Sequence, residues 1–290
     1  MSDRSDGNAN PNLESRISNP VSPAVALTIA GSDCSAGAGL QADLKTFSAL
    51  GVFGVTAVTC VVAEVPRKVA RIDAVDARNV REQIELLLGS FPVGAIKTGL
   101  LFSAEVVQTV ASVLERCAGT IPLIVDPVMI ATSGDALLEP AAVETYRARL
   151  FPRATLITPN MAEAAALIGR PVRDLDEMKA AGSELAQKFG TRILLKGGHL
   201  AGDRAIDLLC DGKTVVEFAA PFVAGVSTHG TGCTYSAAIA ARLALGDPLP
   251  DAIARAKEFV SRAIREYFSL ETSLGEIHAL NHSSDCSRGR

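Results

Sequence analysis

Short, almost continuously apolar segments alternate with longer segments of helical periodicity along most of this 290-residue chain. Five of the apolar segments have the length and the Val, Ile and Leu content of strands: 24–31, 54–62, 121–128, 155–159 and 192–198. Strands that are apolar on both faces are typical of a parallel sheet covered on both sides. The alternation therefore predicts an α/β fold built from βαβ units.

Helical periodicity fills the intervals between these strands. Apolar residues recur at helical spacing in two groups, Val80, Ile84, Leu87 and Leu88, and then Val106, Val107, Val110, Val113 and Leu114. Further helices are expected at 139–149, 161–168, 174–189, 233–245 and 249–268. Segment 205–218 breaks the pattern, because two short strands flank Asp211-Gly212, and this predicts a hairpin at an antiparallel edge of the sheet.

Domain organisation follows from what does not interrupt these elements. No linker rich in Pro or Ser and no internal repeat lies within 23–270, so we expect one domain over 23–282. A disordered N-terminal tail is expected at 1–22 and a C-terminal tail at 283–290. The first twenty residues are polar and lack the apolar region of a signal peptide.

Charge, hydropathy and cysteine content narrow the classes of partner. The net charge of −4 gives no long-range attraction to nucleic acid or anionic lipid, and no segment approaches 18 consecutive apolar residues. The six cysteines are scattered without a CxxC pair, which argues against a disulfide framework or a zinc site. A small-molecule partner, no nucleic acid, no membrane and a cytoplasmic location are the expectations.

Polar residues follow several predicted strands directly: Gly31-Ser32-Asp33, Asp126, Asn160 and Lys196. Each alone is explained as a cap or turn, but ligands of open α/β sheets bind beyond the carboxyl ends of the strands. Segment 31–39, GSDCSAGAG, fits neither GxGxxG nor a P-loop, so it gives little support for nicotinamide binding. Asp33 and Asp43 could instead hydrogen-bond a flat ligand.

The segment THGTGCT, residues 228–234, places a glycine-rich turn immediately before a helix. Backbone N–H groups there, with the positive end of the helix dipole, suit a phosphoryl group in transfer. A cysteine at a helix start has its thiolate favoured, with a pKa below the free value of about 8.5, so Cys233 could accept a proton from a hydroxyl. A thiol protease would need an orienting Asn beside His229, and a buried packing residue is the remaining alternative.

Asn160 and Glu163 stand three residues apart at the start of a predicted helix. A carboxylate there, together with Asp126, could hold Mg²⁺ through water. Considered alone, the pair is better explained as a capping box, in which each side chain bonds to the backbone N–H of the other residue.

Taken together and in order, these segments resemble a known family. They are LTIAGSD with GAGLQADLKTFSALG, KTGL, VDPVM with SGDALL, LITPN with EAAAL, LLKGGH and STHGTGCTYSAAIAA. The set resembles the hydroxymethylpyrimidine/phosphomethylpyrimidine kinases of thiamine biosynthesis, in the ribokinase-like superfamily, over 24–282. The resemblance implies a three-layer αβα sandwich with a mostly parallel sheet and an antiparallel edge. It also implies ATP as co-substrate, Mg²⁺ and a homodimer.

The resemblance further implies roles for individual residues. Gly230 and Gly232 would form an anion hole for the transferring phosphate, and Cys233 would be the proton acceptor. The residues implied at ATP are Asn160, Lys196, Thr228 and Thr231, and those implied at Mg²⁺ are Asp126 and Glu163. The residues implied at the pyrimidine are Gly31, Asp43, Leu100 and Val128.

One position departs from the family. Its members commonly read AQNT after the second strand, whereas this chain reads Ala63-Glu64-Val65-Pro66. Glutamine offers a donor and an acceptor, but an ionised glutamate only accepts. We therefore expect Glu64 to bind the aminopyrimidine in its protonated form. The change keeps open the alternative of a pyridoxal kinase of the same superfamily. A separate alternative is a non-catalytic pyrimidine-binding relative, against which the intact Asp126, Glu163, Lys196 and Cys233 argue.

Overall fold

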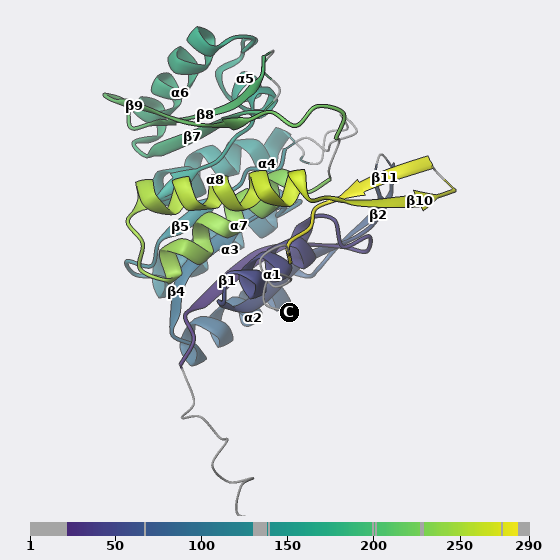
Figure 1. Cartoon of the computed structure of the whole chain (residues 1–290). Helices are drawn as coiled ribbons and strands as arrows, with labels where there is room; N and C mark the ends of the chain where they lie inside the picture. The colour runs from purple at the N-terminus through teal and green to yellow at the C-terminus, as the bar shows by residue number, and fades with distance from the viewer. Residues whose placement is uncertain are drawn as a thin grey trace, which may run out of the picture.

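The chain forms three layers, with a central sheet between two sets of helices, as the computed structural model in Figure 1 shows. The structure describes residues 22–66, 68–129, 138, 140–198, 200, 202–226, 229–273 and 275–283. The predicted tails at 1–22 and 283–290 lie almost wholly outside this part of the chain. The expected αβα sandwich is confirmed.

The central sheet has nine strands in the order β3-β2-β1-β4-β5-β6-β7-β8-β9. The six strands from β2 to β7 in this order are parallel, while β3 pairs antiparallel with β2, and β8 pairs antiparallel with both β7 and β9. Their bounds are β1 Val25–Asp33, β2 Phe53–Val65, β3 Lys68–Ala74, β4 Val93–Thr98, β5 Leu123–Val125, β6 Leu156–Ile157, β7 Arg192–Gly197, β8 Arg204–Cys210 and β9 Val215–Pro221.

The helices divide between the two faces of the sheet. One face carries α1 Gly39–Ala49, α7 Thr231–Ala244 and α8 Leu249–Arg265. The other carries α2 Ala77–Ser90, α3 Ala104–Cys117, α4 Pro140–Thr145, α5 Met161–Ile168 and α6 Leu175–Phe189. A π-helical turn at Tyr146–Leu150 and a 3₁₀ turn at Phe151–Arg153 continue α4.

Alternation along the strands explains why both faces are covered. On β1, Leu27 and Ile29 pack into the core beneath α2 and α3, while Ala26 packs into the core beneath α1, α7 and α8. Side chains of a strand point to opposite faces in turn, so an apolar residue at every position needs a helix layer on each side. The continuous apolar runs of the sequence therefore correspond to strands that are covered by helices on both faces.

The strand order reverses between β1 and β4, because the chain proceeds from β1 outward to β2 and then returns to the other side of β1. Such a switch point opens a crevice beyond the carboxyl ends of the two strands. The predicted site residues at the ends of β1 and β5 therefore lie on the same side of the sheet, at the carboxyl ends of its parallel strands.

Several boundaries differ from the predicted ones. β5 has three residues instead of eight because the chain leaves the sheet at Asp126, and α8 ends at Arg265 before a new strand begins. The predicted edge hairpin is confirmed as β8 and β9. Strand β4 was not among the predicted strands. Strand β3, which pairs antiparallel with β2, was not among the predicted strands either.

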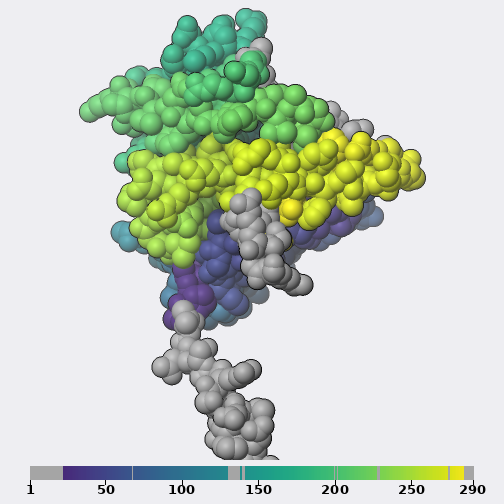
Figure 2. All heavy atoms as spheres, in the orientation of Figure 1, coloured from purple at the N-terminus to yellow at the C-terminus, as the bar shows by residue number. Residues whose placement is uncertain are grey.

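A second, two-stranded sheet was also absent from the predicted elements. It consists of β10 Phe268–Thr272 and β11 Gly275–Ala279, and it projects from the body of the protein beyond α8 (Figure 2). Its residues alternate polar and apolar without a buried face, so it lacks the continuous apolar signal of the central strands. None of the described helices is both long and apolar enough to cross a membrane.

Candidate active site

The start of α7 is built from a turn that requires glycine. Gly230 is the N-cap of α7 and has a φ of 81°, in the left-handed region. A Cβ on Gly230 would lie 1.9 Å from the carbonyl oxygen of Gly37, so the loop after β1 packs directly against this turn. As a glycine, the N-cap residue Gly230 has no side chain with which to cap α7. This arrangement is typical of an anion-binding helix terminus.

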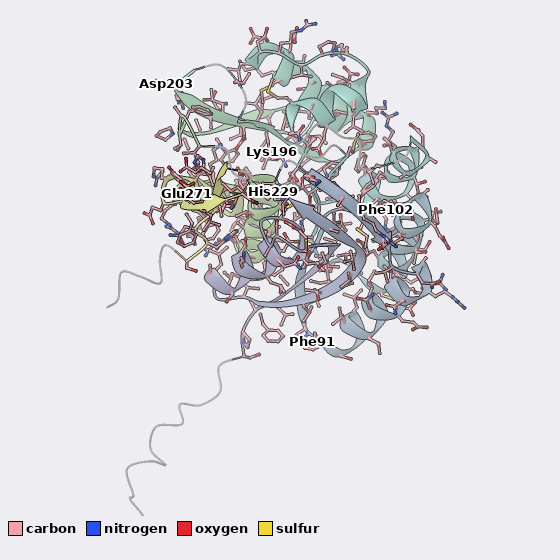
Figure 3. The ribbon with its side chains drawn as sticks, turned by 90° about the vertical axis from the view of Figure 1, so that its right-hand side faces the viewer. Phe91, Phe102, Lys196, Asp203, His229 and Glu271 are labelled. Carbon is pink, nitrogen blue, oxygen red and sulfur yellow. The ribbon has the colours of Figure 1, made fainter. Side chains whose placement is uncertain are left out.

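Gly232, in the first turn of α7, brings this helix start to the residues at the ends of β5 and β7. A Cβ on Gly232 would lie 3.1 Å from Nζ of Lys196 and 3.8 Å from Oδ2 of Asp126. In the view of Figure 3, Lys196 and His229, the residue before Gly230, both lie in the central part of the face that is turned to the viewer. Three segments far apart in the sequence thus converge on one point.

Asp126 is buried and fully hydrogen-bonded. Lys196 Nζ lies 3.0 Å from its Oδ1, the Thr158 hydroxyl donates to the same oxygen, and the Ser236 hydroxyl donates to Oδ2. Burial alone would raise the pKa of Asp126, but the charges of Lys196 and Lys97 outweigh it and hold the carboxyl below its usual range. Asp126 is therefore ionised at neutral pH beside an ammonium group.

Asn160 and Glu163 form a complete capping box at the start of α5. The Glu163 N–H donates to the Asn160 side chain, and the Asn160 N–H donates to Glu163 Oε2 at 2.9 Å. Glu163 Oε1 accepts from the Met129 N–H. Burial raises the pKa of Glu163, partly opposed by Lys196. Both carboxylate oxygens of Glu163 thus accept from backbone N–H groups. The capping box predicted for this pair is present, whether or not Glu163 also contributes to an Mg²⁺ site.

Lys97, the residue before the last one of β4, is a buried cation that sequence reasoning missed. Its Nζ lies 2.8 and 3.0 Å from the two carboxylate oxygens of Asp43, which also accepts from the Thr28 hydroxyl at 2.6 Å. Burial disfavours its charge, but Asp43 outweighs it and raises the pKa of Lys97. A lysine inside the apolar run VGAIKT was the available signal. We call Asp43, Lys97, Asp126 and Lys196 the lysine-paired cluster.

Asp43 was expected at the pyrimidine. Its carboxylate is fully buried and taken up by Lys97 and Thr28, so in this structure it orients the lysine. The contact with a pyrimidine stays a prediction.

Cys233 corrects one expectation. The thiol is half-buried, and burial raises the pKa of Cys233 to about 11, against the opposing effects of Lys97 and of the Gly39 N–H. The lowered pKa expected from the helix start is therefore wrong. Desolvation and the neighbouring carboxylates Asp126 and Asp43 exceed the helix-end effect.

Gly31, Cys60 and Leu100 meet at the end of β1. A Cβ on Gly31 would lie 2.6 Å from Sγ of Cys60 and 3.6 Å from Cδ2 of Leu100, so glycine is needed for this close approach. Val128 has a φ of 43°, a strained conformation for a β-branched residue. Strain of this kind concentrates at functional sites. Gly31 and Leu100, both predicted at the pyrimidine, are adjacent.

Asp33, Glu64 and His229 lie together above the loop that follows β1. His229 Nε2 is 3.3 Å from Asp33 Oδ2 and 4.0 Å from Glu64 Oε2. Burial opposes the charge on His229, but Asp33 and Glu64 outweigh it and raise the pKa of its imidazole. Burial raises the pKa of Glu64, and the charge of Asp33 adds to it. We call these three residues the imidazole cluster.

Asp33 mainly organises the loop. Its carboxylate accepts from the N–H groups of Ser35, Gly37 and Ala38. Burial would raise the pKa of Asp33, but His229 and these donors lower it to about 2. Of the other predicted residues, Thr231 begins α7, and Thr228 lies outside the described residues.

Comparison with known proteins identifies the family. The family model described as phosphomethylpyrimidine kinase matches residues 33–278. The chain belongs to this family. A hydroxymethylpyrimidine/phosphomethylpyrimidine kinase of Streptomyces coelicolor is 47% identical over 261 residues, covering 89% of this chain and 95% of the relative. The bifunctional thiamine biosynthesis protein of Geobacter sulfurreducens is 42% identical over 88% of this chain, which spans about half of that protein, 51%.

Solved structures similar to this chain include a phosphomethylpyrimidine kinase and a pyridoxal kinase. The Clostridium difficile phosphomethylpyrimidine kinase is 37% identical with a TM-score of 0.73, covering 83% of this chain and 99% of its own. The Staphylococcus aureus pyridoxal kinase in complex with AMP-PCP and pyridoxal is 33% identical with a TM-score of 0.82, covering 93% and 97%. The expected ribokinase-like fold is therefore confirmed.

Proposed function

We propose that this chain is an ATP-dependent kinase that phosphorylates hydroxymethylpyrimidine and then the resulting monophosphate. Membership of the phosphomethylpyrimidine kinase family supports this activity. The observation that carries it is the glycine turn at the start of α7, which lies against the Asp126–Lys196 ion pair through Gly232. A kinase needs such a junction of amide donors, cation and carboxylate around the transferring phosphate.

The residues of the chain act mainly by positioning and by neutralising charge, because phosphoryl transfer requires little covalent chemistry of the protein. Backbone N–H groups of the Gly230–Gly232 turn would hold the transferring phosphoryl group. Lys196 would pair with the nucleotide phosphates, exchanging part of its present contact with Asp126 for them. The substrate hydroxyl would lie near Cys233, in line with the terminal phosphate.

The donor set fits Mg²⁺ held through water. Asp126 and Glu163 each have hydrogen-bond partners at both carboxylate oxygens, yet every such oxygen can accept more than one contact. Mg²⁺ keeps several of its waters and binds by one or two carboxylates together with phosphate. It would neutralise the phosphate charge and orient the leaving group, while Asp126 and Glu163 fix its hydrated shell.

Cys233 would take the proton of the substrate hydroxyl. With a pKa of about 11 the thiol is mostly protonated at neutral pH, so the reactive form is a minor thiolate population. Lys97 and the Gly39 N–H stabilise that thiolate. Lys97 is therefore proposed as the residue that makes a cysteine usable as a base at this position.

Pyridoxal phosphorylation is the second candidate function. It is favoured by the TM-score of 0.82 to the Staphylococcus aureus pyridoxal kinase. The glutamate at position 64, where glutamine is expected in a pyrimidine kinase, also keeps this function open. ADP release measured side by side with hydroxymethylpyrimidine, its monophosphate and pyridoxal separates the candidates. Turnover of both pyrimidines supports the proposal, turnover of pyridoxal alone replaces it, and no turnover with any of the three leaves a binding protein. We also propose a cytoplasmic homodimer, which sedimentation at several concentrations tests for its oligomeric state.

A further inference from the structure

The imidazole cluster contains more ligand atoms than the proposed kinase reaction uses. One nitrogen of His229 and one oxygen each from Asp33 and Glu64 all lie within 4.8 Å of one another. The three side chains come from the end of β1, the end of β2 and the turn before α7, and they are 2%, 15% and 16% exposed. Three protein ligands that converge from separate elements are the usual basis of an open metal site.

The spacing of the ligand atoms suits a small dication. Two ligands of a tetrahedral zinc ion, each at about 2.0–2.1 Å, lie roughly 3.3 Å from each other. His229 Nε2 and Asp33 Oδ2 are 3.3 Å apart, and His229 Nε2 and Glu64 Oε2 are 4.0 Å apart. The His229–Asp33 pair already has the required separation. The His229–Glu64 pair would reach it if the two side chains moved together by less than about one ångström.

Among the described residues, no hydrogen bond of good geometry reaches the imidazole nitrogen despite this proximity. His229 Nε2 is buried and lacks a partner of suitable geometry, although two carboxylate oxygens face it. A bare lone pair on this nitrogen would be repelled by both carboxylates, so the nitrogen carries either a proton, as the neutral Nε2–H tautomer or the imidazolium, or a metal ion.

The three ligands are held in place by their surroundings. The turn amides of Gly37 and Ala38 donate to Asp33, and the ring of His229 packs against Gly37, 2.9 Å from where a Cβ would stand. The Cys34 thiol donates to the Glu64 carbonyl at 3.1 Å, and the Glu64 N–H donates back to its sulfur at 3.3 Å. Outer contacts of this kind orient metal ligands and strengthen binding.

We propose that Asp33, Glu64 and His229 bind a transition-metal dication of the Zn²⁺ class, at a site separate from the Mg²⁺–phosphate position. One imidazole and two carboxylates suit Zn²⁺, Co²⁺ or Mn²⁺ better than Mg²⁺, which prefers an all-oxygen shell. The site depends on Glu64, since the glutamine common in the family is a neutral and weaker ligand. A bound metal and a protonated aminopyrimidine would compete for the same carboxylate.

Metal titration of the full chain tests this proposal without any turnover. The chelator-treated protein is titrated with Co²⁺ in excess Mg²⁺, following the visible absorption bands, and with Zn²⁺ by calorimetry. We expect one equivalent per chain in the parent, and affinity at least about tenfold weaker in Glu64→Gln and His229→Gln. Thermal melting of each variant checks that it is folded.

Two further variants locate the ion. Glu271→Gln removes an exposed carboxylate of β10, and Asp126→Asn removes the carboxylate beside Lys196, and both should bind as the parent does. Absence of binding in the parent would assign a proton to the cluster. Equal binding in Glu64→Gln, an equal loss in Glu271→Gln, or a loss confined to Asp126→Asn would each overturn the proposed site.

Discussion

The lysine-paired cluster and the imidazole cluster lie at the same edge of the sheet but balance charge differently. In the first, Asp43 contacts Lys97 and Asp126 contacts Lys196, with hydroxyl donors completing both carboxylates. In the second, two carboxylates share a single imidazole. We proposed the balanced cluster as the part of the site used with every substrate, and the unbalanced one contains Glu64, at a position where glutamine is expected in the family. Substitutions in the two should therefore differ in kind.

Cys233→Ala should have the largest effect. Losing a general base beside the lysine-paired cluster should lower kcat by about 10²–10⁴ and leave nucleotide affinity nearly unchanged. Because the pKa of Cys233 is raised to about 11, kcat of the parent should rise with pH through the neutral range. Steady-state kinetics from pH 6 to 9 checks both, with Cys117→Ala, an exposed thiol, as control. A kcat within a few-fold of the parent would return Cys233 to a packing role.

Lys97→Met should cost about 3–5 kcal/mol of unfolding free energy, because Asp43 is left as an unpaired buried charge. Denaturant unfolding measures the change. Lys179→Met breaks an exposed pair with Asp176 and should cost about 0–1 kcal/mol. Adding Asp43→Asn to Lys97→Met should restore part of the loss, and similar costs for the two single lysine variants would contradict the assigned difference.

Gly230→Ala should cost roughly 1–3 kcal/mol more than Gly225→Ala. Both glycines have left-handed φ values, 81° and 76°, but a Cβ on Gly230 meets Gly37 while a Cβ on Gly225 meets nothing within 4 Å. The shared backbone cost cancels, so the difference reports crowding at the helix start. Unfolding curves and KM for ATP provide the two measurements, and equal stabilities would refute the close packing.

Glu64→Gln should have the smallest effect, a change of a few-fold in KM for the pyrimidine and little change in kcat or stability. The pKa of Glu64 is raised, so its carboxylate is neutralised at a higher pH than usual. The difference in KM between parent and variant should therefore be greatest at neutral pH and should decrease as the pH falls through the pKa of Glu64. Glu271→Gln serves as control, and identical KM values at acid and neutral pH would remove Glu64 from substrate recognition.

The sheet and its helices could be predicted because each strand is apolar on both faces, as Leu27 and Ala26 illustrate. Strand β3 and the β10–β11 hairpin could not, since they are largely exposed and have no buried face to impose a pattern. Asp126 and Lys196 were predictable at the site because they stand directly after or at the end of apolar strands. Their pairing with each other is a tertiary fact that spacing does not contain.

Electrostatics was the least predictable property. The helix start predicted a reactive thiolate at Cys233, but burial and the carboxylates of Asp126 and Asp43, each more than one hundred positions away in the sequence, raise its pKa. Lys97 was hidden for the same reason, since its partner Asp43 lies in another element. A sequence shows which groups can ionise, and only the packing determines how much water each one keeps.

The helix that carries Cys233 is completed by the far end of the chain. The Thr234 hydroxyl meets Nε2 of His282 at 3.0 Å in a buried contact, and burial, with the charge of Lys45, lowers the pKa of His282 to about 4. The neutral ring thus arrives 48 residues after its partner. Removing His282 should therefore leave the layers of the fold in place but take away a buried contact of the helix that carries Cys233.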